Sequence, residues 1–255
     1  MRMRMVGAIV LCVIGAVFGG CSRYVTPGAA ASFRAMGITP EEVASGTDFA
    51  MREKMDRKPL AGFPCVIALA RVQGPGYSSF SERAYGSGKY SVVTGRTVET
   101  DEHIKTLSGL AQVRGVATLN RLVLPERLET EKDLREAAAS VRADMLLIYT
   151  FDTTFDVGTT IPAMGTITLG LFPNEKAQVG TTASCALLDT RNGYVYGLSE
   201  ASATRSQLAN AWTSREAVED CRKLTEQEAF DKLVGQFPGM WAGVVAQYGA
   251  GSAVK

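Results

Sequence analysis

The sequence predicts an α/β domain with a mixed central sheet, and three observations support this. Residues 145–151 form a near-continuous apolar run, which is typical of a strand covered by helices on both faces. A predicted helix at residues 130–142 precedes this strand, and a predicted strand at residues 116–124 precedes the helix, so the three segments form a βαβ unit with parallel strands. Asn192-Gly193 then predicts a tight turn between two antiparallel strands. Together these patterns indicate a mixed sheet with helices packed on it, and an antiparallel hairpin that is followed by helices.

The elements before the βαβ unit follow from capping residues and apolar patterns. Thr39-Pro40 begins a short predicted helix, because threonine is a good N-cap and proline fits the first helical position. Gly115 is a natural stop for a preceding helix whose apolar residues line one side. Apolar and β-branched stretches bounded by glycine or proline predict strands. In chain order we expect a helix at 48–57, strands at 63–72 and 90–98, and a helix at 101–114.

The pattern changes after the central strand. Residues 152–165 are polar and rich in turn-forming residues, so we expect a loop there. Thr225 and Glu228 form a predicted N-cap for the C-terminal helices, which carry Trp241 and Tyr248. The remaining predicted segments are strands at 166–172, 177–188 and 194–204, with a turn at 189–193.

The first residues have the composition of an export signal. Two arginines within the first four residues precede a short apolar run at residues 6–18, and two glycines stand before Cys21. The run is shorter than the roughly 17–25 residues of a membrane span. Phe18-Gly19-Gly20-Cys21 resembles the bacterial lipobox, which implies cleavage after residue 20 and acylation of Cys21. An ordinary secretory signal with an incidental cysteine is the alternative.

The lipobox resemblance divides the chain into three parts. Residues 1–20 are the expected signal peptide, residues 21–38 the lipidated N-terminus and tether, and residues 39–255 one globular domain. In a host with two membranes, Ser22 after the acylated cysteine implies the outer membrane, facing the periplasm. The chain has 27 Lys and Arg against 26 Asp and Glu, so no basic surplus favours nucleic acid. Membrane contact through the lipid is therefore the expected association.

The cysteines that would remain after acylation are odd in number. They are Cys65, Cys185 and Cys221. An exported chain can form disulfides, so one bridge with a spare thiol is allowed. Three buried free thiols are equally compatible with the sequence, and the spacing does not indicate which pair would form a bridge.

Residues with catalytic or metal-binding chemistry are sparse. The only histidine, His103, is predicted on the polar side of its helix, and no Gly-x-Ser-x-Gly elbow, Walker loop or zinc spacing is present. We therefore expect no cofactor and no metal. Asp152, Asp156 and Asp189 stand at the ends of predicted strands, where catalytic carboxylates and ordinary turn residues both occur.

Two apolar features are candidates for partner contact. Ile161, Pro162 and Met164 form an apolar tip between polar flanks, which would dock on a partner or a membrane, or pack over the sheet. Trp212, and Trp241 with Tyr248, would form an aromatic contact surface or anchor the last helices in the core.

Two short motifs carry a resemblance to a known group. They are "RADMLLIYTFDT" at residues 142–153, with Ala143-Asp144 before the strand, and "LLDTRNGYVYG" at residues 187–197, with Asp189 and Gly193 in the turn. In this order they are similar to the α/β domain of the curli-secretion-channel lipoproteins and to the TolB N-terminal domain. The resemblance implies a non-enzymatic envelope protein that works by contact or assembly, and it transfers no catalytic residue.

We therefore expect a membrane-anchored lipoprotein that acts as a binding or assembly module, with an envelope protein or further copies of itself as partner. An oligomeric secretion channel of the curli type is the first alternative, but it requires long strands of about 9–11 residues. Only residues 159–171 offer such a strand, and Pro162 and Gly165 interrupt it. A hydrolase that uses the three aspartates is the second alternative.

Overall fold

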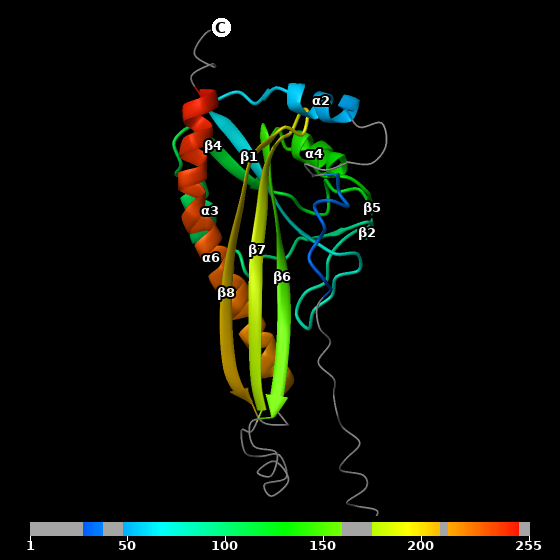
Figure 1. Cartoon of the computed structure of the whole chain (residues 1–255), viewed down its shortest axis with the longest axis vertical. Coiled ribbons are helices and arrows are strands. Elements are labelled where there is room, and N and C mark those ends of the chain that lie inside the picture. The colour runs from blue at the N-terminus through cyan, green and yellow to red at the C-terminus, as the bar shows by residue number, and fades with distance from the viewer. Residues whose placement is uncertain (1–27, 38–47, 160–174, 210–213, 250–255) are drawn as a thin grey trace, which may run out of the picture.

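The computed structural model describes residues 28–37, 48–159, 175–209 and 214–249. It confirms an α/β class with a mixed sheet (Figure 1). Among the described residues the helices are α2 (Asp48–Asp56), α3 (Asp101–Ser108), α4 (Glu131–Ser140) and α6 (Ser214–Tyr248). The strands are β1 (Cys65–Gln73), β2 (Ser87–Gly88), β3 (Ser91–Val93), β4 (Val113–Thr118), β5 (Arg127–Leu128), β6 (Met145–Thr159), β7 (Glu175–Asp189) and β8 (Val195–Ala209).

The main sheet has the order β3-β1-β6-β7-β8, and β4 also pairs with β1. Strand β1 is parallel to β4 and to β6, whereas β6, β7 and β8 are antiparallel in sequence. The two strands of the expected βαβ unit are therefore parallel, as predicted. They are not neighbours, because β1 lies between them.

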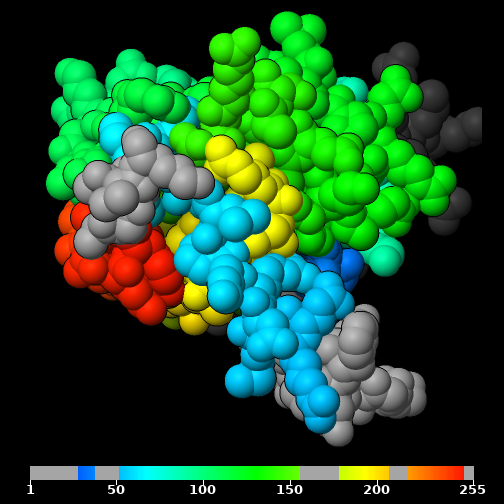
Figure 2. Space-filling model, turned by 90° about the horizontal axis from the view of Figure 1, so that it is seen from above, coloured from blue at the N-terminus to red at the C-terminus, as the bar shows by residue number. Residues whose placement is uncertain are grey.

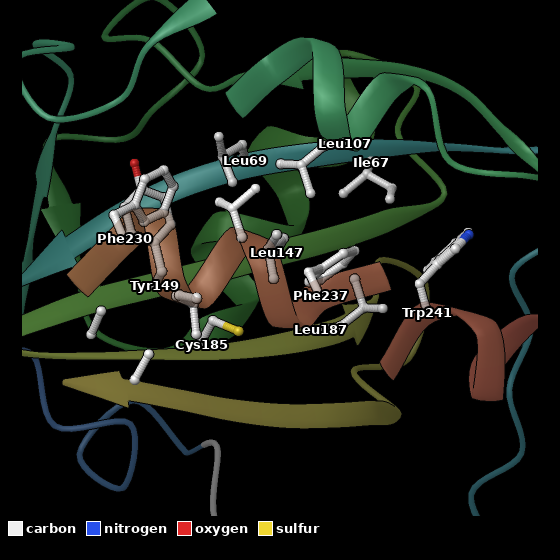
Figure 3. Packing of buried hydrophobic residues seen from close by; sticks show 14 of the residues in the cluster. Ile67, Leu69, Leu107, Leu147, Tyr149, Cys185, Leu187, Phe230, Phe237 and Trp241 are labelled. Atoms are coloured by element: carbon white, nitrogen blue, oxygen red, sulfur yellow. The ribbon is translucent and has the colours of Figure 1, made fainter. Parts of the chain in front are cut away.

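Apolar layers cover both faces of the sheet around β1. Leu147 and Tyr149 of β6 point to one face, where they pack against Leu107 of α3 and against Phe230 and Phe237 of α6 (Figure 3). The alternating residues of β6 point to the other face and pack against α4. Burial on both faces accounts for the continuous apolar run at the start of β6. We call this part of the molecule the head: β1, β3, β4, α3, α4 and the adjoining halves of β6, β7 and β8.

Beyond the head, β6, β7 and β8 continue side by side as a three-stranded ribbon (Figure 1). We define the ribbon as residues 150–159, 175–184 and 200–209. The predicted loop at residues 152–165 is wrong for its first part, because β6 continues to Thr159 in register with β7. Threonine and valine favour strands, and full pairing satisfies the backbone of this polar segment. The expected strand at residues 166–172 lies outside the described residues.

Helix α6 is one helix of 35 residues rather than several. The predicted N-cap at Thr225 is wrong, because this residue is buried inside the helix and its hydroxyl donates to the carbonyl of Cys221. The helix also continues through Pro238, with Phe237 and Trp241 buried on either side of it. Burial of the apolar side of α6 keeps the helix continuous through Thr225, a residue type that often begins a helix, and through Pro238, a residue type that often interrupts one.

Residues 28–37 pack on the head, although the sequence predicts a tether through residue 38. Ala31 and Met36 are buried in the apolar layer beside α4. The backbone N–H of Ala31 donates to the hydroxyl of Thr150 over 3.0 Å, and the N–H of Glu131 donates to the carbonyl of Met36. The expectation of a tether is therefore wrong for these residues. Burial of their apolar side chains stabilises an ordered segment on the head. The predicted helix at Thr39 lies outside the described residues.

Candidate functional site

The three candidate aspartates do not form a cluster. Asp152 is exposed on the ribbon, and Asp156 is four residues further along the same strand. Asp189 is fully buried at the other end of β7, where it pairs in register with Met145. Seven residues of β6 separate Met145 from Asp152, which corresponds to about 23 Å. The described carboxylates of Asp152 and Asp189 are therefore too far apart to act on one substrate bond.

Asp189 instead holds a loop against the end of the sheet. Its carboxylate accepts the N–H groups of Leu60 and Ala61, each over 2.7 Å, and the hydroxyl of Tyr196 over 2.9 Å. Figure 2, which looks onto the head, shows the segment after α2 lying against the β7–β8 turn. Burial, followed by the hydrogen bond to this carboxylate, raises the pKa of Tyr196. The role of Asp189 is therefore architectural.

The two resemblance motifs meet at this same end of the sheet. The Asp144 carboxylate accepts the N–H of Val66 over 3.0 Å and lies 3.3 Å from the guanidinium of Arg191. The N–H of Thr190 donates to the carbonyl of Asp144. Asp144 and the turn that begins at Asp189 thus connect the starts of β1 and β6 to the end of β7. Sequence reasoning did not single out Asp144 as a contact residue.

His103 is buried, which contradicts the prediction that it faces solvent. Its Nε2 lies 2.6 Å from Oδ1 of Asp231, and its Nδ1 accepts the N–H of Thr100 over 3.0 Å. Its ring also packs edge-on against Phe230. Helix α6 lies against α3 and covers the histidine, a contact that the pattern of α3 alone does not indicate. His103 therefore connects the two helices.

The three cysteines are free and buried. The structure favours three buried thiols over a bridge and a spare thiol. Burial raises the pKa of Cys65 and of Cys185 to about 12, and it also raises the pKa of Cys221. All three therefore stay protonated and unreactive at neutral pH.

Among the described residues, the candidate aromatic side chains pack into or against the core. The indole N–H of Trp241 donates to the carbonyl of Ala111 over 2.7 Å, and its ring packs on Phe237. Tyr248 contacts Tyr194 and Tyr196 at the end of α6. Core anchoring is therefore the role of Trp241. Lying outside the described residues are Cys21, Ile161, Pro162, Met164 and Trp212.

Beyond Thr150, which residues 28–37 cover, the ribbon presents one polar face that no described element covers. Its side chains are small, and all are exposed or half-buried. Cross-strand hydrogen bonds connect Thr182 to Ser202 over 3.0 Å and Ser184 to Glu200 over 2.7 Å. We call this surface the hydroxyl face; its members are Asp152, Thr154, Thr182, Ser184, Glu200, Ser202, Thr204 and Ser206. It offers rows of hydroxyl donors and acceptors, with two carboxylates as its charged groups.

Along most of the ribbon, its two edge strands, β6 and β8, have no neighbouring strand on their outer side among the described residues. In the described part of the chain, β6 pairs with β1 only as far as Ile148, and β8 is the last strand of the sheet. Helix α6 partly protects the β8 edge, because the ammonium of Lys232 donates to the carbonyl of Ser202 over 3.1 Å. Covering an edge strand with a helix is a common way to block its pairing with another strand. The β6 edge is covered at Thr150, which accepts the N–H of Ala31, and beyond this residue no described strand pairs with the β6 edge.

The opposite face of the ribbon is held to α6 by buried charges. Arg71 and Arg222 both bind the carboxylate of Glu226, over 3.1 and 2.6 Å, and Thr153 of the ribbon donates to the same carboxylate over 3.1 Å. We call the buried set Arg71, Arg222, Glu82, Glu219 and Glu226 the arginine network. Burial alone would lower the pKa of Arg71, but the carboxylates of Glu226 and Glu82 raise it above its usual value, so the residue stays charged. No sequence spacing indicates this network, because its members are up to 155 positions apart.

No helix within the described ranges is both long enough and apolar enough to cross a membrane. No family model matches the chain, and none of the curated proteins does. Among solved structures, the chain is similar to a "putative lipoprotein" from Caulobacter crescentus CB15, with 16% identity, a TM-score of 0.28, and coverage of 44% of this chain and 79% of that one. It is also similar to the hypothetical protein CT253 from Chlamydia trachomatis, with 12% identity, a TM-score of 0.29, and coverage of 73% and 99%. Likeness at this level carries no information on function.

Proposed function

We propose that the protein is a lipid-anchored protein of the bacterial envelope that acts by binding a partner protein rather than by catalysis. The sequence at Phe18-Gly19-Gly20-Cys21 supports the anchor. In a host with two membranes, the protein would sit on the periplasmic side of the outer membrane. The observation that carries the binding role is the hydroxyl face of the ribbon.

Two properties of the ribbon support a role in binding, namely a face without apolar cover and an edge strand without a described neighbouring strand. A three-stranded sheet ordinarily needs a covered apolar face, and here α6 supplies that cover on one side only. The other side carries mostly hydroxyl side chains, and these polar groups can form hydrogen bonds with a strand or loop of a partner. Partner strands commonly add to sheet edges through backbone hydrogen bonds, and beyond Thr150 no described strand pairs with the β6 edge.

The apolar residues Ile161, Pro162 and Met164 belong to the same proposal. In the sequence they stand between the distal ends of β6 and β7, in a stretch of residues 160–174 without any charged residue. We expect them to contact the partner or the membrane. A photo-crosslinking residue at position 164 should form adducts with lipid or with one protein, and adducts with neither would contradict this assignment.

The anchor is tested by metabolic labelling with radioactive palmitate. The wild-type protein should incorporate the label and fractionate with membranes, whereas Cys21→Ser should do neither. Equal labelling of both proteins, or labelling of neither, would remove the anchor from the proposal.

The binding role is tested by photo-crosslinking in intact cells. One probe replaces Thr204 on the hydroxyl face, and the control probe replaces Ser140, which is exposed on α4 in the head. The probe at position 204 should give an adduct of defined mass that the probe at position 140 does not give. In addition, Ser202→Arg should abolish the adduct, and Ser140→Arg should leave it unchanged. Identical adducts at both positions would contradict a specific role of this face.

The strand lengths favour a second candidate function, an oligomeric assembly such as a secretion channel. Strands β6, β7 and β8 each have 15 residues, so the objection that the chain lacks long strands does not hold. The two ribbon edges belong to different strands, and contacts between unlike surfaces produce rings where the rotation between copies closes. Purified lipidated protein would then form ring-shaped particles in detergent. A strictly monomeric protein at high concentration would exclude this candidate.

A further inference from the structure

We infer that the distal end of the ribbon, where β6 ends at Thr159 and β7 begins at Glu175, faces the bilayer that holds the lipid, with the head turned away. This inference rests on the proposed acylation of Cys21. It adds an orientation of the body on the membrane, which the acylation alone does not determine.

The first argument is the direction of residues 28–37. Met36 lies beside the start of α4 in the head, through its hydrogen bond to Glu131, whereas Ala31 lies at Thr150, where the ribbon begins. Followed toward its N-terminus, this segment therefore runs from the head toward the ribbon, and in Figure 1 it descends beside β6. Gly28 then lies against Tyr77, since a Cβ at Gly28 would be 3.4 Å from the Tyr77 Cα.

The second argument is the length of chain between the lipid and the body. Seven residue steps separate Cys21 from Gly28, which allow a reach of at most about 25 Å. From Thr150 to the distal end the ribbon measures about 30 Å. Gly28 is three residues beyond Ala31 in that direction, so it begins about 10 Å further along. The distal end therefore lies within reach of the lipid-bearing residue.

The opposite end of the molecule lies beyond this reach. From Thr150 back to Met145 the head extends about 17 Å, and α2 with its following loop adds a further layer about 10 Å thick. A tether that starts about 10 Å on the ribbon side of Ala31 would have to reverse and span all of this. The short connection thus permits the distal end, and not the head, to stand on the bilayer.

The inference is tested with full-length lipidated protein in phosphatidylcholine vesicles. A fluorophore is attached to Ser206→Cys in the ribbon or to Glu136→Cys on α4, both exposed positions. The native thiols are buried, so they do not compete for a maleimide label. Quenching by a nitroxide on the lipid headgroup should be several-fold stronger at position 206 than at position 136. Equal quenching, or stronger quenching at position 136, would overturn the orientation.

A variant with a longer tether tests whether the length of the tether sets the orientation. Insertion of about 20 Gly and Ser residues between Pro27 and Gly28 adds a mean reach of about 25 Å. The difference between the two positions should then shrink, and an unchanged difference would mean that tether length does not set the orientation. Failure of the anchor itself has a separate signature, because protein that lacks the acyl group would not float with the vesicles at all.

Discussion

The head and the ribbon bind the same helix by different means. In the head, α6 packs its Phe230, Phe237 and Trp241 on a sheet whose other face is also covered. Along the ribbon, α6 combines an apolar contact, which includes Phe151 against Phe230, with the buried ion pair of Arg222 and Glu226, and most of the other face of the sheet stays open. The head is therefore stabilised by apolar burial, which has no direction, and the ribbon by apolar burial together with ion pairs that require a defined geometry.

Apolar burial and buried ion pairs contribute differently to the stability of the fold and to the position of α6. Burying apolar area contributes about 25 cal/mol per Å². A buried ion pair contributes little net stability relative to apolar residues of the same size, because desolvation offsets the attraction between the charges. However, loss of one partner leaves a buried charge unpaired. The arginine network therefore resists displacement of α6 along the ribbon, and four predictions test the comparison.

The largest effect is expected at the arginine network. Arg222 is fully buried and pairs with Glu219 and Glu226, so Arg222→Met leaves these carboxylates with fewer partners in a dry site. The free energy of unfolding should fall by about 3–5 kcal/mol in urea titrations. Arg205→Met is the control, because Arg205 forms a solvent-accessible pair with Glu228, and pairs of this kind contribute little to stability. Equal losses for both variants would show that burial of the network does not matter.

The next effect is expected in the central strand of the head. Leu147 is buried between α6 and the sheet, so Leu147→Ala should cost about 2–5 kcal/mol through lost transfer free energy and a residual cavity. Leu122→Ala is the control, because Leu122 is 94% exposed. Calorimetry or urea unfolding measures both variants. A loss below about 1 kcal/mol for Leu147→Ala would contradict the apolar account of the head.

The thiols distinguish the two regions through pH. Burial raises the pKa of Cys65 and Cys185 in the head from 9.0 to about 12 in the folded state. A raised folded pKa stabilises the fold at pH values below 9, and this contribution is lost as the pH rises from about 9 to about 12. Urea unfolding at pH 8 and pH 10.5 should show a loss of about 1–2 kcal/mol per thiol.

The matched measurement is the same pH series on Cys185→Ala. In this variant the free energy of unfolding should fall less between pH 8 and pH 10.5, by the contribution of one thiol. The native protein should also react slowly with maleimides at pH 7.5, and Cys221, the cysteine on α6 opposite the ribbon, should react first as the pH rises. Rapid labelling of Cys65 or Cys185 at neutral pH would contradict the burial of the head thiols.

The smallest effect is expected on the hydroxyl face. Thr182→Val removes one exposed hydroxyl and keeps the β-branched shape, so the stability should change by no more than about 0.5 kcal/mol. Thr181→Val, on the face toward α6, removes a buried hydroxyl that lies 3.1 Å from that of Thr153 and should cost about 1 kcal/mol. A loss at position 182 as large as that at position 181 would indicate that the open face is buried in the protein as purified.

Local patterns predict the elements whose partners are close in the sequence. The turn at Asn192-Gly193, the strand that starts at Met145 and the parallel direction of its βαβ partner all follow from periodicity and turn chemistry. The helix predicted at 101–114 is too long, because α3 ends at Ser108 and Gly115 lies in β4. Other errors fall where distant contacts decide the outcome. Residues 152–159 are polar enough to suggest a loop, and only pairing with β7 makes them a strand.

The candidate site could be predicted only in part, for the same reason. The hydroxyl residues of β7 and β8 are visible in the sequence, but their shared open face depends on the register between the strands. His103 and the N-terminal segment at Ala31 are buried by elements that lie more than 100 positions away.

The sequence by itself determined the α/β class, the central strand, the final hairpin and the lipobox resemblance at Cys21, because each of these is written in a short stretch of residues. Only the tertiary structure decided the length of the ribbon, the continuity of α6 and the assembly of the arginine network. The physical reason is that apolar periodicity and turn preference act between near neighbours, whereas strand register and buried ion pairs depend on which distant segments the folded chain brings together.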